Sequence, residues 1–308
     1  MRQRPQPRWS PLVLAAGVGA TSWAAIFVRL ADEAPALSMA AYRLAIATVV
    51  MVVVAAGALV TGRDHLPGRR QVPLLLLSGA LLAGHFWSWF ASLERTSVGS
   101  SVVIVGMQPL LGAALGYVFL AESPRRNEYV GIALAFGGLL IIGGSDFASS
   151  PGELGGDALA LLGGFLAASY RTVGRSLRPG MSAAIYSATV YGVAAACLWL
   201  LVVVVRPRAA GFDGTTWTFI LLLGLIPQVV GHTAFNWALA HYRVVTVSLA
   251  NLGEPVAATL LAIPILGERP TVAVLAGGPL IVAGVVVGLR GSDGEPAPAR
   301  ARRSRARV

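Results

Sequence analysis

The chain contains one pattern twice, at a fixed distance. A proline, a glutamate thirteen residues later and two spaced glycines recur 146 positions further along the sequence. The matched pairs are Pro109–Pro255, Leu115–Leu261, Leu120–Leu266, Glu122–Glu268, Pro124–Pro270, Gly131–Gly277, Leu134–Leu280 and Gly138–Gly284. Both copies lie in apolar stretches of the length that crosses a bilayer, about 20 residues for a hydrocarbon core of roughly 30 Å. The sequence therefore predicts two copies of one membrane-embedded unit.

The composition supports a membrane protein rather than a soluble one. Apolar residues make up 56% of the chain and charged residues 12%, whereas soluble domains carry roughly a quarter charged residues. We predict ten spans, of which 127–144 is short and 157–177 carries Arg171 and Arg175. The spans are 11–30, 36–60, 72–93, 98–120, 127–144, 157–177, 183–205, 216–239, 244–266 and 271–290. The first resembles a signal peptide, but its length and the nine spans that follow favour an uncleaved helix.

The positions of the arginines predict the orientation, since the chain has 24 arginines and no lysine. Placing both termini in the cytoplasm leaves eighteen arginines inside and five outside, which satisfies the positive-inside rule. Arg171 and Arg175 are counted among the cytoplasmic ones. The net charge of +10 then needs no nucleic-acid partner. Cys197 is the only cysteine, so neither a disulfide framework nor a cysteine metal site is expected.

An odd number of spans in each half makes the repeat inverted. We expect a cytoplasmic N-terminus (1–10), a five-helix repeat (11–144), an external linker (145–156), a second repeat (157–290) and a disordered, Arg-rich cytoplasmic tail (291–308). The predicted fold class is all-α: a polytopic membrane protein with ten transmembrane helices in two inverted five-helix repeats. Inverted halves place a site near the bilayer midplane and favour secondary transport by alternating access.

The paired motifs resemble those of a known family. Gln-Pro-Leu-Leu at 108–111 leads to Leu-Ala-Glu at 120–122, and Glu-Pro-Val at 254–256 leads to Leu-Gly-Glu at 266–268. With Tyr42-Arg43-Leu44, these motifs resemble the EamA type of the drug/metabolite transporter superfamily over about residues 10–290. The resemblance implies a carrier of small solutes, often an exporter of amino acids or other metabolites, with no cofactor. Ala121, where the second copy has Gly267, is expected to loosen the first exit turn.

Glu254 is the sharpest candidate for the site, because it lies about 15 Å into a span at 1.5 Å per residue. An acid at that depth is a functional-site hypothesis by default, and we hypothesise that it couples transport to protons. Hydrogen bonding between helices is the structural alternative. Asn251, one turn earlier, and Gln108, the counterpart of Glu254, are candidate polar contacts.

Other polar and aromatic residues inside the spans are weaker candidates. Arg43 could bind a substrate carboxylate or pin two helices. His85 and His232 could relay protons or join helices. Trp23, Trp87 and Trp237 could line the site, and an aromatic belt at the membrane interface is the alternative for these residues.

The remaining motif residues are predicted to be structural. Pro109 and Pro255 interrupt their helices, while Glu122 and Glu268 are expected to cap the helices that follow. No ligand spacing indicates a metal, and no Gly-Lys-Ser/Thr motif indicates ATP.

The sequence thus predicts a multi-pass protein of a bacterial inner membrane that transports a small molecule. An uncoupled facilitator or exchanger, an integral-membrane enzyme and a receptor are the alternatives, and a monomer and a homodimer are both left open.

Overall fold

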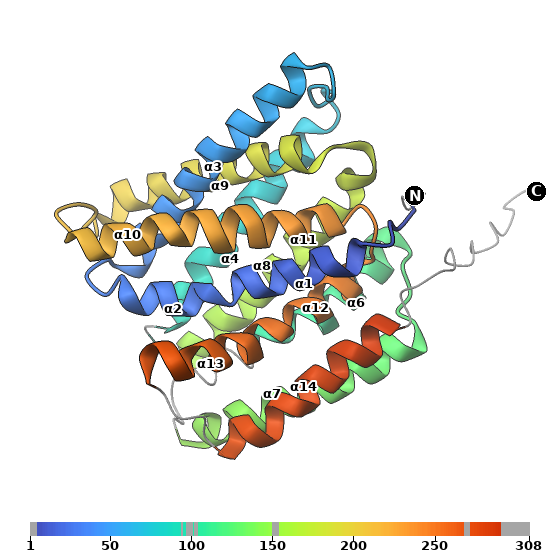
Figure 1. Ribbon diagram of the computed structural model, residues 1–308, viewed down its shortest axis with the longest axis vertical. Coiled ribbons are helices and arrows are strands. Elements are labelled where there is room, and N and C mark those ends of the chain that lie inside the picture. Colours follow the sequence, from blue (N-terminus) through green and yellow to red (C-terminus); the bar gives the residue numbers. More distant parts are fainter. Residues whose placement is uncertain are drawn as a thin grey trace, which may run out of the picture.

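The computed structural model describes residues 5–93, 95–96, 101, 104–149, 154–267 and 272–290. These residues form a bundle of helices with no strand among them (Figure 1). The predicted tail, Glu268 and Pro270 lie outside the described residues. The elements are α1 (Ser10–Thr21), α2 (Trp23–Leu30), α3 (Ala36–Val60), α4 (Val72–Leu93), α6 (Gln108–Leu120), α7 (Arg126–Ser149), α8 (Leu154–Leu177), η1 (Arg178–Gly180), α9 (Ala183–Val205), α10 (Gly214–Leu223), η2 (Gly224–His232), α11 (Thr233–Ala238), α12 (Val244–Asn251), α13 (Gly253–Leu266) and α14 (Val272–Arg290).

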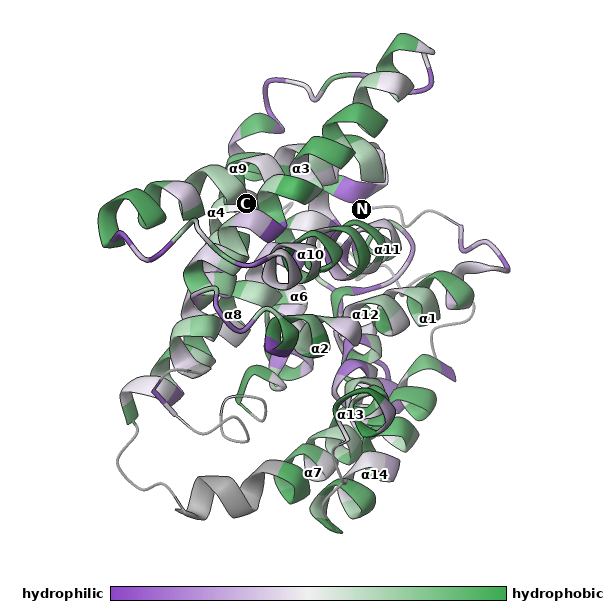
Figure 2. Cartoon of the chain, turned by 60° about the vertical axis from the view of Figure 1, so that its left-hand side comes forward, coloured by the Kyte–Doolittle hydropathy of each residue, from purple (hydrophilic) through white to green (hydrophobic). Residues whose placement is uncertain are grey.

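Seven stretches of the described chain are long and apolar enough to cross a membrane. They are Ser10–Leu30, Ala36–Val60, Val72–Ser92, Ala183–Val205, Gly214–Ala238, Val244–Leu266 and Val272–Arg290. Much of the helical surface is hydrophobic, and hydrophilic residues gather in loops and at helix ends (Figure 2). Val53 and Val204 are 68% and 71% exposed, an arrangement that suits lipid and not water. The all-helical membrane class is confirmed, while the count of ten spans stays a prediction.

Helices that are counterparts in the two halves pack against each other. The most extensive contacts join α7 with α14, α4 with α8 and α3 with α9, followed by α4 with α9, α6 with α8, α1 with η2, α6 with α12 and α3 with η2. In the order of the predicted spans, α3 with α9, α6 with α12 and α7 with α14 each pair a helix with its own counterpart. The contact between α4 (span three) and α8 (span six) corresponds to the contact between η2 (span eight) and α1 (span one), because each span has its counterpart five spans away. The contacts therefore follow a pseudo-two-fold relation between the halves.

Counterpart helices also run in opposite directions. Ser38, near the start of α3, donates a hydrogen bond to the carbonyl of Arg208 beyond the end of α9. Thr48, further along α3, packs against Gly192 in the middle of α9. The start of α1 and the end of α14 lie on the same side of the molecule (Figure 1).

The repeated glycines form the contact between α7 and α14, which lie side by side in Figure 1. A Cβ added to Gly138 would lie 2.5 Å from the carbonyl oxygen of Gly277. A Cβ added to Gly131 would lie 2.6 Å from that of Gly284. In the sequence repeat, Gly131 is the counterpart of Gly277 and Gly138 is the counterpart of Gly284. In the contact the pairing is crossed: Gly138 meets Gly277, and Gly131 meets Gly284. Small residues let these antiparallel helices approach closely.

Several spans are interrupted near their middle. The first is divided at Ser22, whose hydroxyl donates to the carbonyl of Val18 at 2.6 Å. The turn at 106–107 precedes Gln108 and Pro109, and Leu252 separates α12 from α13 just before Glu254 and Pro255. Proline has no N–H to donate and belongs in a first turn, so both repeated prolines begin a new helix. Both spans are therefore interrupted beside their repeated prolines.

The two exit turns share one conformation despite their different residues. Ala121 ends α6 at φ 55°, and Gly267 ends α13 at φ 67°. The expectation that Ala121 loosens its turn is wrong, because the alanine holds the same left-handed cap. A residue with a Cβ is strained there, whereas glycine is not.

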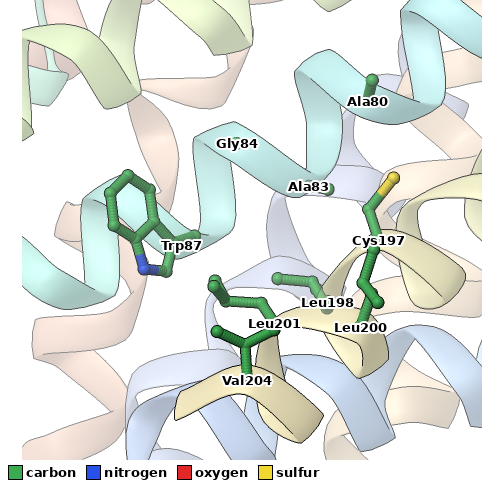
Figure 3. A pocket seen from close by; sticks show the side chains of 9 residues that line it. All are labelled: Ala80, Ala83, Gly84, Trp87, Cys197, Leu198, Leu200, Leu201 and Val204. Atoms are coloured by element: carbon green, nitrogen blue, oxygen red, sulfur yellow. The ribbon is translucent and has the colours of Figure 1, made fainter.

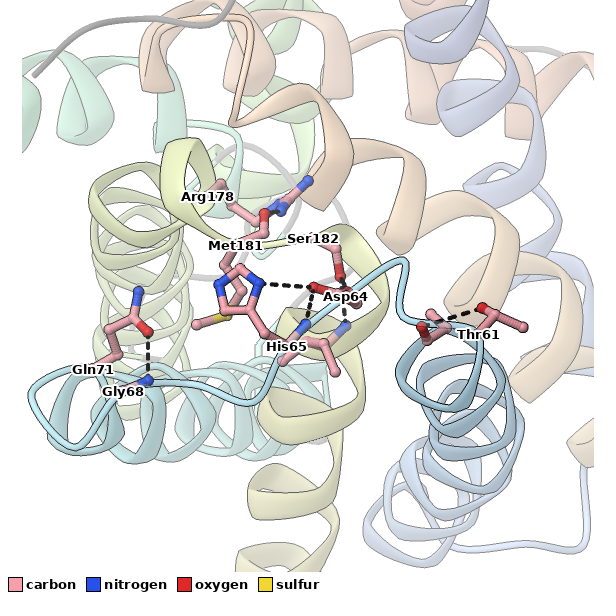
Figure 4. Close-up of polar contacts among 10 residues, drawn as sticks. Thr61, Asp64, His65, Gly68, Gln71, Arg178, Met181 and Ser182 are labelled. Carbon is pink, nitrogen blue, oxygen red and sulfur yellow. Dashed lines mark hydrogen bonds and ion pairs between the residues drawn. The ribbon is translucent and has the colours of Figure 1, made fainter.

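The connection between α3 and α4 is tied to the turn before α9 (Figure 4). The hydroxyl of Ser182, the N-cap of α9, donates to the carboxylate of Asp64. Gly68 donates its backbone N–H to Gln71 Oε1 at 2.9 Å, which closes a turn within the loop. Arg178 in η1 donates to the carbonyl of Met181 and, at 2.7 Å, to that of Asn236. These bonds fix one end of the bundle.

Candidate functional site

Two buried arginines bridge the halves, each bonded to a glutamine of the other half. Arg43 Nε of α3 donates to Gln228 Oε1 of η2 at 2.7 Å. Arg171 Nη1 of α8 donates to Gln108 Oε1 of α6 at 2.5 Å. All four residues are at most 7% exposed. The join between the halves is therefore held by two reciprocal Arg–Gln pairs.

The local sequence explains how these residues reach the join. Pro109 and the turn before it place Gln108 at the start of α6, where the helix restarts inside the bundle. Pro227 removes one helical hydrogen bond within η2, a segment wound more widely than an α-helix, and Gln228 follows it directly. Such π-type segments frequently occur at functional sites.

The guanidinium charges at the join have few counter-charges. Among the described residues, no carboxylate lies within ion-pair distance of Arg43 or Arg171. Among the described residues, Glu254 is the acid within electrostatic reach of both arginines. The ring of Phe86 lies 4.7 Å from the Arg43 guanidinium carbon, which gives partial compensation through the face of the ring.

Unsatisfied polar atoms also gather around this point. Arg171 Nε, Gln228 Nε2, His232 Nδ1 and Asn251 Oδ1 are buried without a hydrogen-bond partner. Each such atom costs about 1–3 kcal/mol when it is removed from water. Buried polar groups in proteins are normally bonded, so an unsatisfied set beside two arginines makes this place a candidate site for a polar ligand.

A second buried network lies next to the arginines. Tyr170 donates its hydroxyl to Asn236 Oδ1 at 3.2 Å, and Asn236 Nδ2 donates to the hydroxyls of Ser187 and Tyr191 at 3.1 Å each. The hydroxyl of Tyr191 also contacts that of Thr233 at 3.2 Å. This network joins α8, α9 and α11, and it gives the arginine pairs rigid support.

The structure brings together Arg43, Gln108, Asn251 and Glu254 among the predicted site residues, and it places His85 close to them. Asn251 ends α12 and Glu254 lies in the first turn of α13, so the break at Leu252 separates them. They stay three residues apart along one span, because Leu252 keeps right-handed helical backbone angles of φ −67° and ψ −12°. Sequence reasoning did not select Gln228, and it assigned Arg171 to the cytoplasmic charges. Both residues have a signal in the sequence. Arg171 is a charged residue inside an apolar stretch, and Gln228 is a polar residue inside another apolar stretch, directly after Pro227.

The histidine candidates lie close to the arginines but differ in their bonding. His85 Nδ1 is 2.9 Å from the carbonyl oxygen of Gly163, so it joins α4 to α8. Its ring stacks on Trp89 with centroids 6.0 Å apart. His232 lies against Phe86, at a centroid distance of 5.7 Å, and keeps an unpartnered Nδ1. Of the two, His232 has a ring nitrogen left for a further contact.

The three tryptophan candidates lie in separate places. Trp87 is 39% exposed and lines an outward groove between α4 and α9, together with Cys197, Leu201 and Val204 (Figure 3). Trp237 stacks on Trp9 at 4.8 Å. Trp23 stacks on Phe27 at 5.6 Å, within an apolar cluster of α2, α3 and α10. The structure does not gather them around Arg43 and Arg171.

Glu122 pairs with a neighbouring helix. Its Oε1 accepts from Arg175 Nε of α8 at 2.8 Å, and Arg175 Nη1 also donates to the carbonyl of Leu239 at 2.9 Å. The start of α7 is capped instead by Glu128, which accepts from the backbone N–H of Arg125 at 2.7 Å, as in a capping box.

Glu128 is a further buried acid that the sequence reading did not select. It is fully buried, lies 2.8 Å from Arg243 Nη2 and accepts from the Thr246 hydroxyl at 2.6 Å. These contacts tie the start of α7 to α12, in the same region where Glu122 ties the end of α6 to α8.

Comparison with known proteins places this geometry in a family. The model of the EamA-like transporter family matches residues 8–144 and again residues 154–290. A probable amino-acid metabolite efflux pump of Salmonella typhimurium is 27% identical over 72% of this chain and 79% of its own length. A probable terminal-alkyne amino-acid exporter of Streptantibioticus cattleyicolor is 26% identical over 90% of this chain and 91% of its own.

The fold is also found among solved structures. One crystal structure superposes with a TM-score of 0.78 at 18% identity, covering 93% of this chain and 99% of that one. Duplicated family matches, counterpart helices in contact and a polar site at the join agree with one another. The chain belongs to the EamA-like transporter family.

Proposed function

We propose that this protein is a secondary transporter that exports a small organic solute by alternating access. The main support for this proposal is the pair of Arg–Gln hydrogen bonds between the halves, Arg43 with Gln228 and Arg171 with Gln108. Each bond links one half to the other, so rocking the halves would alter both bonds at once. Antiparallel counterpart helices support the inverted repeat that such rocking requires.

Several finer features belong to the same proposal. We take the chain to cross a bacterial inner membrane ten times with both termini in the cytoplasm, as the distribution of arginines favours. Two relatives are named for amino-acid compounds, and those names support amino acids or related metabolites as solutes. Export as the direction also follows those relatives.

Glu254 is proposed to couple transport to protons. It lies at a helix break, in electrostatic reach of Arg43 and Arg171, and its backbone carbonyl accepts from the Ser22 hydroxyl of the first span at 3.3 Å. An acid whose nearest charges are two arginines would bind or release a proton as the solute and the arginines rearrange. The alternative within the same class is an uncoupled facilitator or exchanger.

Flux into proteoliposomes tests the proposal. Purified protein should accelerate the movement of an amino-acid solute, and an imposed pH gradient should drive that movement. Glu254→Gln should keep exchange down a solute gradient and lose the response to the pH gradient. If the glutamine variant follows the pH gradient as well as the wild type, Glu254 is not the coupling residue. If the protein moves no solute at all, the transport function is wrong, and an integral-membrane enzyme or a receptor is favoured instead.

A further inference from the structure

The charge at the join points to a recognition residue that neither the sequence motifs nor the comparisons assign. Arg171 is 3% exposed, and its described hydrogen-bond acceptors are neutral: Gln108 Oε1 at 2.5 Å and the Ser248 hydroxyl at 3.4 Å. Its Nε has no partner. A guanidinium inside a membrane protein is costly unless a negative group accompanies it, and Arg171 lacks one in ion-pair contact among the described residues.

The two arginines and one acid leave the join with a surplus positive charge. Glu254 can compensate one guanidinium at most, and it lies within reach of both. Arg43 already has a glutamine oxygen on its Nε and an aromatic face against its guanidinium. Arg171 therefore has a buried donor without an acceptor, at Nε, and its charge has the smaller compensation.

We propose that Arg171 binds the carboxylate of the transported solute, with the amide oxygen of Gln108 occupying part of that position when no solute is bound. A carboxylate offers two coplanar oxygens that match the guanidinium fork. It would supply the missing negative charge and an acceptor for Nε at the same time. This inference rests on the transport function proposed above, and it makes the substrate class a carboxylate-bearing solute.

The neighbourhood supports a small polar ligand at this point. Ser248, which contacts Arg171, lies one helical turn before Asn251 on α12, so the unpartnered Asn251 Oδ1 is close to the same place. Tyr170 lies next to Arg171 on α8, within electrostatic reach of the guanidinium. The tyrosine is itself anchored to Asn236. The guanidinium is thus positioned by bonds on one side and left open at Nε.

Arg175 provides a matched control, because it is a second buried arginine one turn further along the same helix. It is 5% exposed and pairs with Glu122 at 2.8 Å. Replacing Arg175 by glutamine leaves a carboxylate unpaired, which should lower the thermal midpoint of the purified protein. Replacing Arg171 by glutamine removes an uncompensated charge, so the midpoint should stay equal or rise. Equal losses of stability in the two variants would contradict the charge surplus, whether or not a solute is known.

Ligand binding completes the test. The thermal midpoint is measured with each standard amino acid and with the matching amino-acid amide, which differs only by lacking the carboxylate. The wild type and Arg175→Gln should be stabilised by at least one amino acid and not by its amide. Arg171→Gln should lose about tenfold or more in affinity, and Arg171→Lys should recover part of it.

Two results would overturn the inference. One is an amide that stabilises the wild type as well as its acid, or no amino acid that stabilises it. The other is a wild-type response retained in Arg171→Gln. Flux in proteoliposomes separates this failure from that of the proposed function, because a protein that moves amides or amines but not carboxylates is still a transporter.

Discussion

The contact between α7 and α14 gives a prediction with a built-in control, since two adjacent glycines of α7 face different surroundings. A Cβ on Gly138 would lie 2.5 Å from the Gly277 carbonyl oxygen and 2.8 Å from Ile281 Cγ1, whereas a Cβ on Gly137 meets nothing within 4 Å. Gly138→Ala must therefore push the two helices apart. Gly137→Ala adds a methyl group in open space.

The expected difference in stability between Gly138→Ala and Gly137→Ala follows from the helix propensity that the two variants have in common. Each gains about 1 kcal/mol of helix propensity from the change of glycine to alanine. Only Gly138→Ala also incurs overpacking, which costs typically about 1–3 kcal/mol. The difference between the variants isolates the contact, and Gly137→Ala should be the more stable by about 1–3 kcal/mol. Gly284→Ala, at the counterpart position, should resemble Gly138→Ala, because its Cβ would lie 2.6 Å from the Gly131 carbonyl oxygen.

Thermal unfolding of the purified variants in detergent measures this difference. At roughly 2–4 °C per kcal/mol for chains of 150–250 residues, the midpoints of the adjacent variants should differ by several degrees. A Gly138→Ala protein that melts together with Gly137→Ala would refute the close approach of α7 and α14. That result would also remove the largest of the contacts between counterpart helices.

Three further changes test other parts of the fold. Ala121→Gly should raise stability by about 1 kcal/mol, because Ala121 holds a left-handed cap at φ 55° that costs about 1–2 kcal/mol for a residue with a Cβ; an unchanged thermal midpoint would contradict the strain. Glu122→Gln should lower stability by about 3 kcal/mol by leaving Arg175 unpaired, and adding Arg175→Gln should restore part of the loss; additive losses in a double-mutant cycle would show that the pair is not coupled. The Thr216 backbone N–H, which bonds to Asp213 at 2.7 Å, lowers the pKa of Asp213. The stabilisation from this cap is therefore present above the ordinary pKa of an aspartate and is lost as the pH falls through the lowered value, and Asp213→Ala should flatten that part of the stability–pH curve.

Sequence reasoning reached the helices and their duplication because both depend on local patterns. Apolar length defines the spans, and the repeated prolines mark breaks that the structure has at Gln108 and just before Glu254. The offset of 146 residues also identified the glycines that meet between α7 and α14. These features are written in consecutive residues, so they can be read without coordinates.

The composition of the join could not be read in this way, because it depends on residues far apart in the chain. Arg171 and Gln108 are separated by 63 positions, and Arg43 and Gln228 by 185. No local spacing predicts that the glutamine of one half meets the arginine of the other. Trp87 shows that a local pattern can also select a residue outside the site. It occupies an apolar segment at a suitable depth, yet its side chain faces outward beside Cys197.

Labelling equivalent loops of the two halves tests the inverted repeat most directly. Leu66, between α3 and α4, and Ala210, between α9 and α10, are both exposed and occupy corresponding connections. Each is changed to cysteine in a Cys197→Ser background and treated with a membrane-impermeant maleimide in vesicles of known orientation. If the halves are inverted, residue 66 reacts from the cytoplasmic side and residue 210 from the opposite side. Reaction of both from the same side would contradict the inverted halves, and with them the alternating-access site at their join.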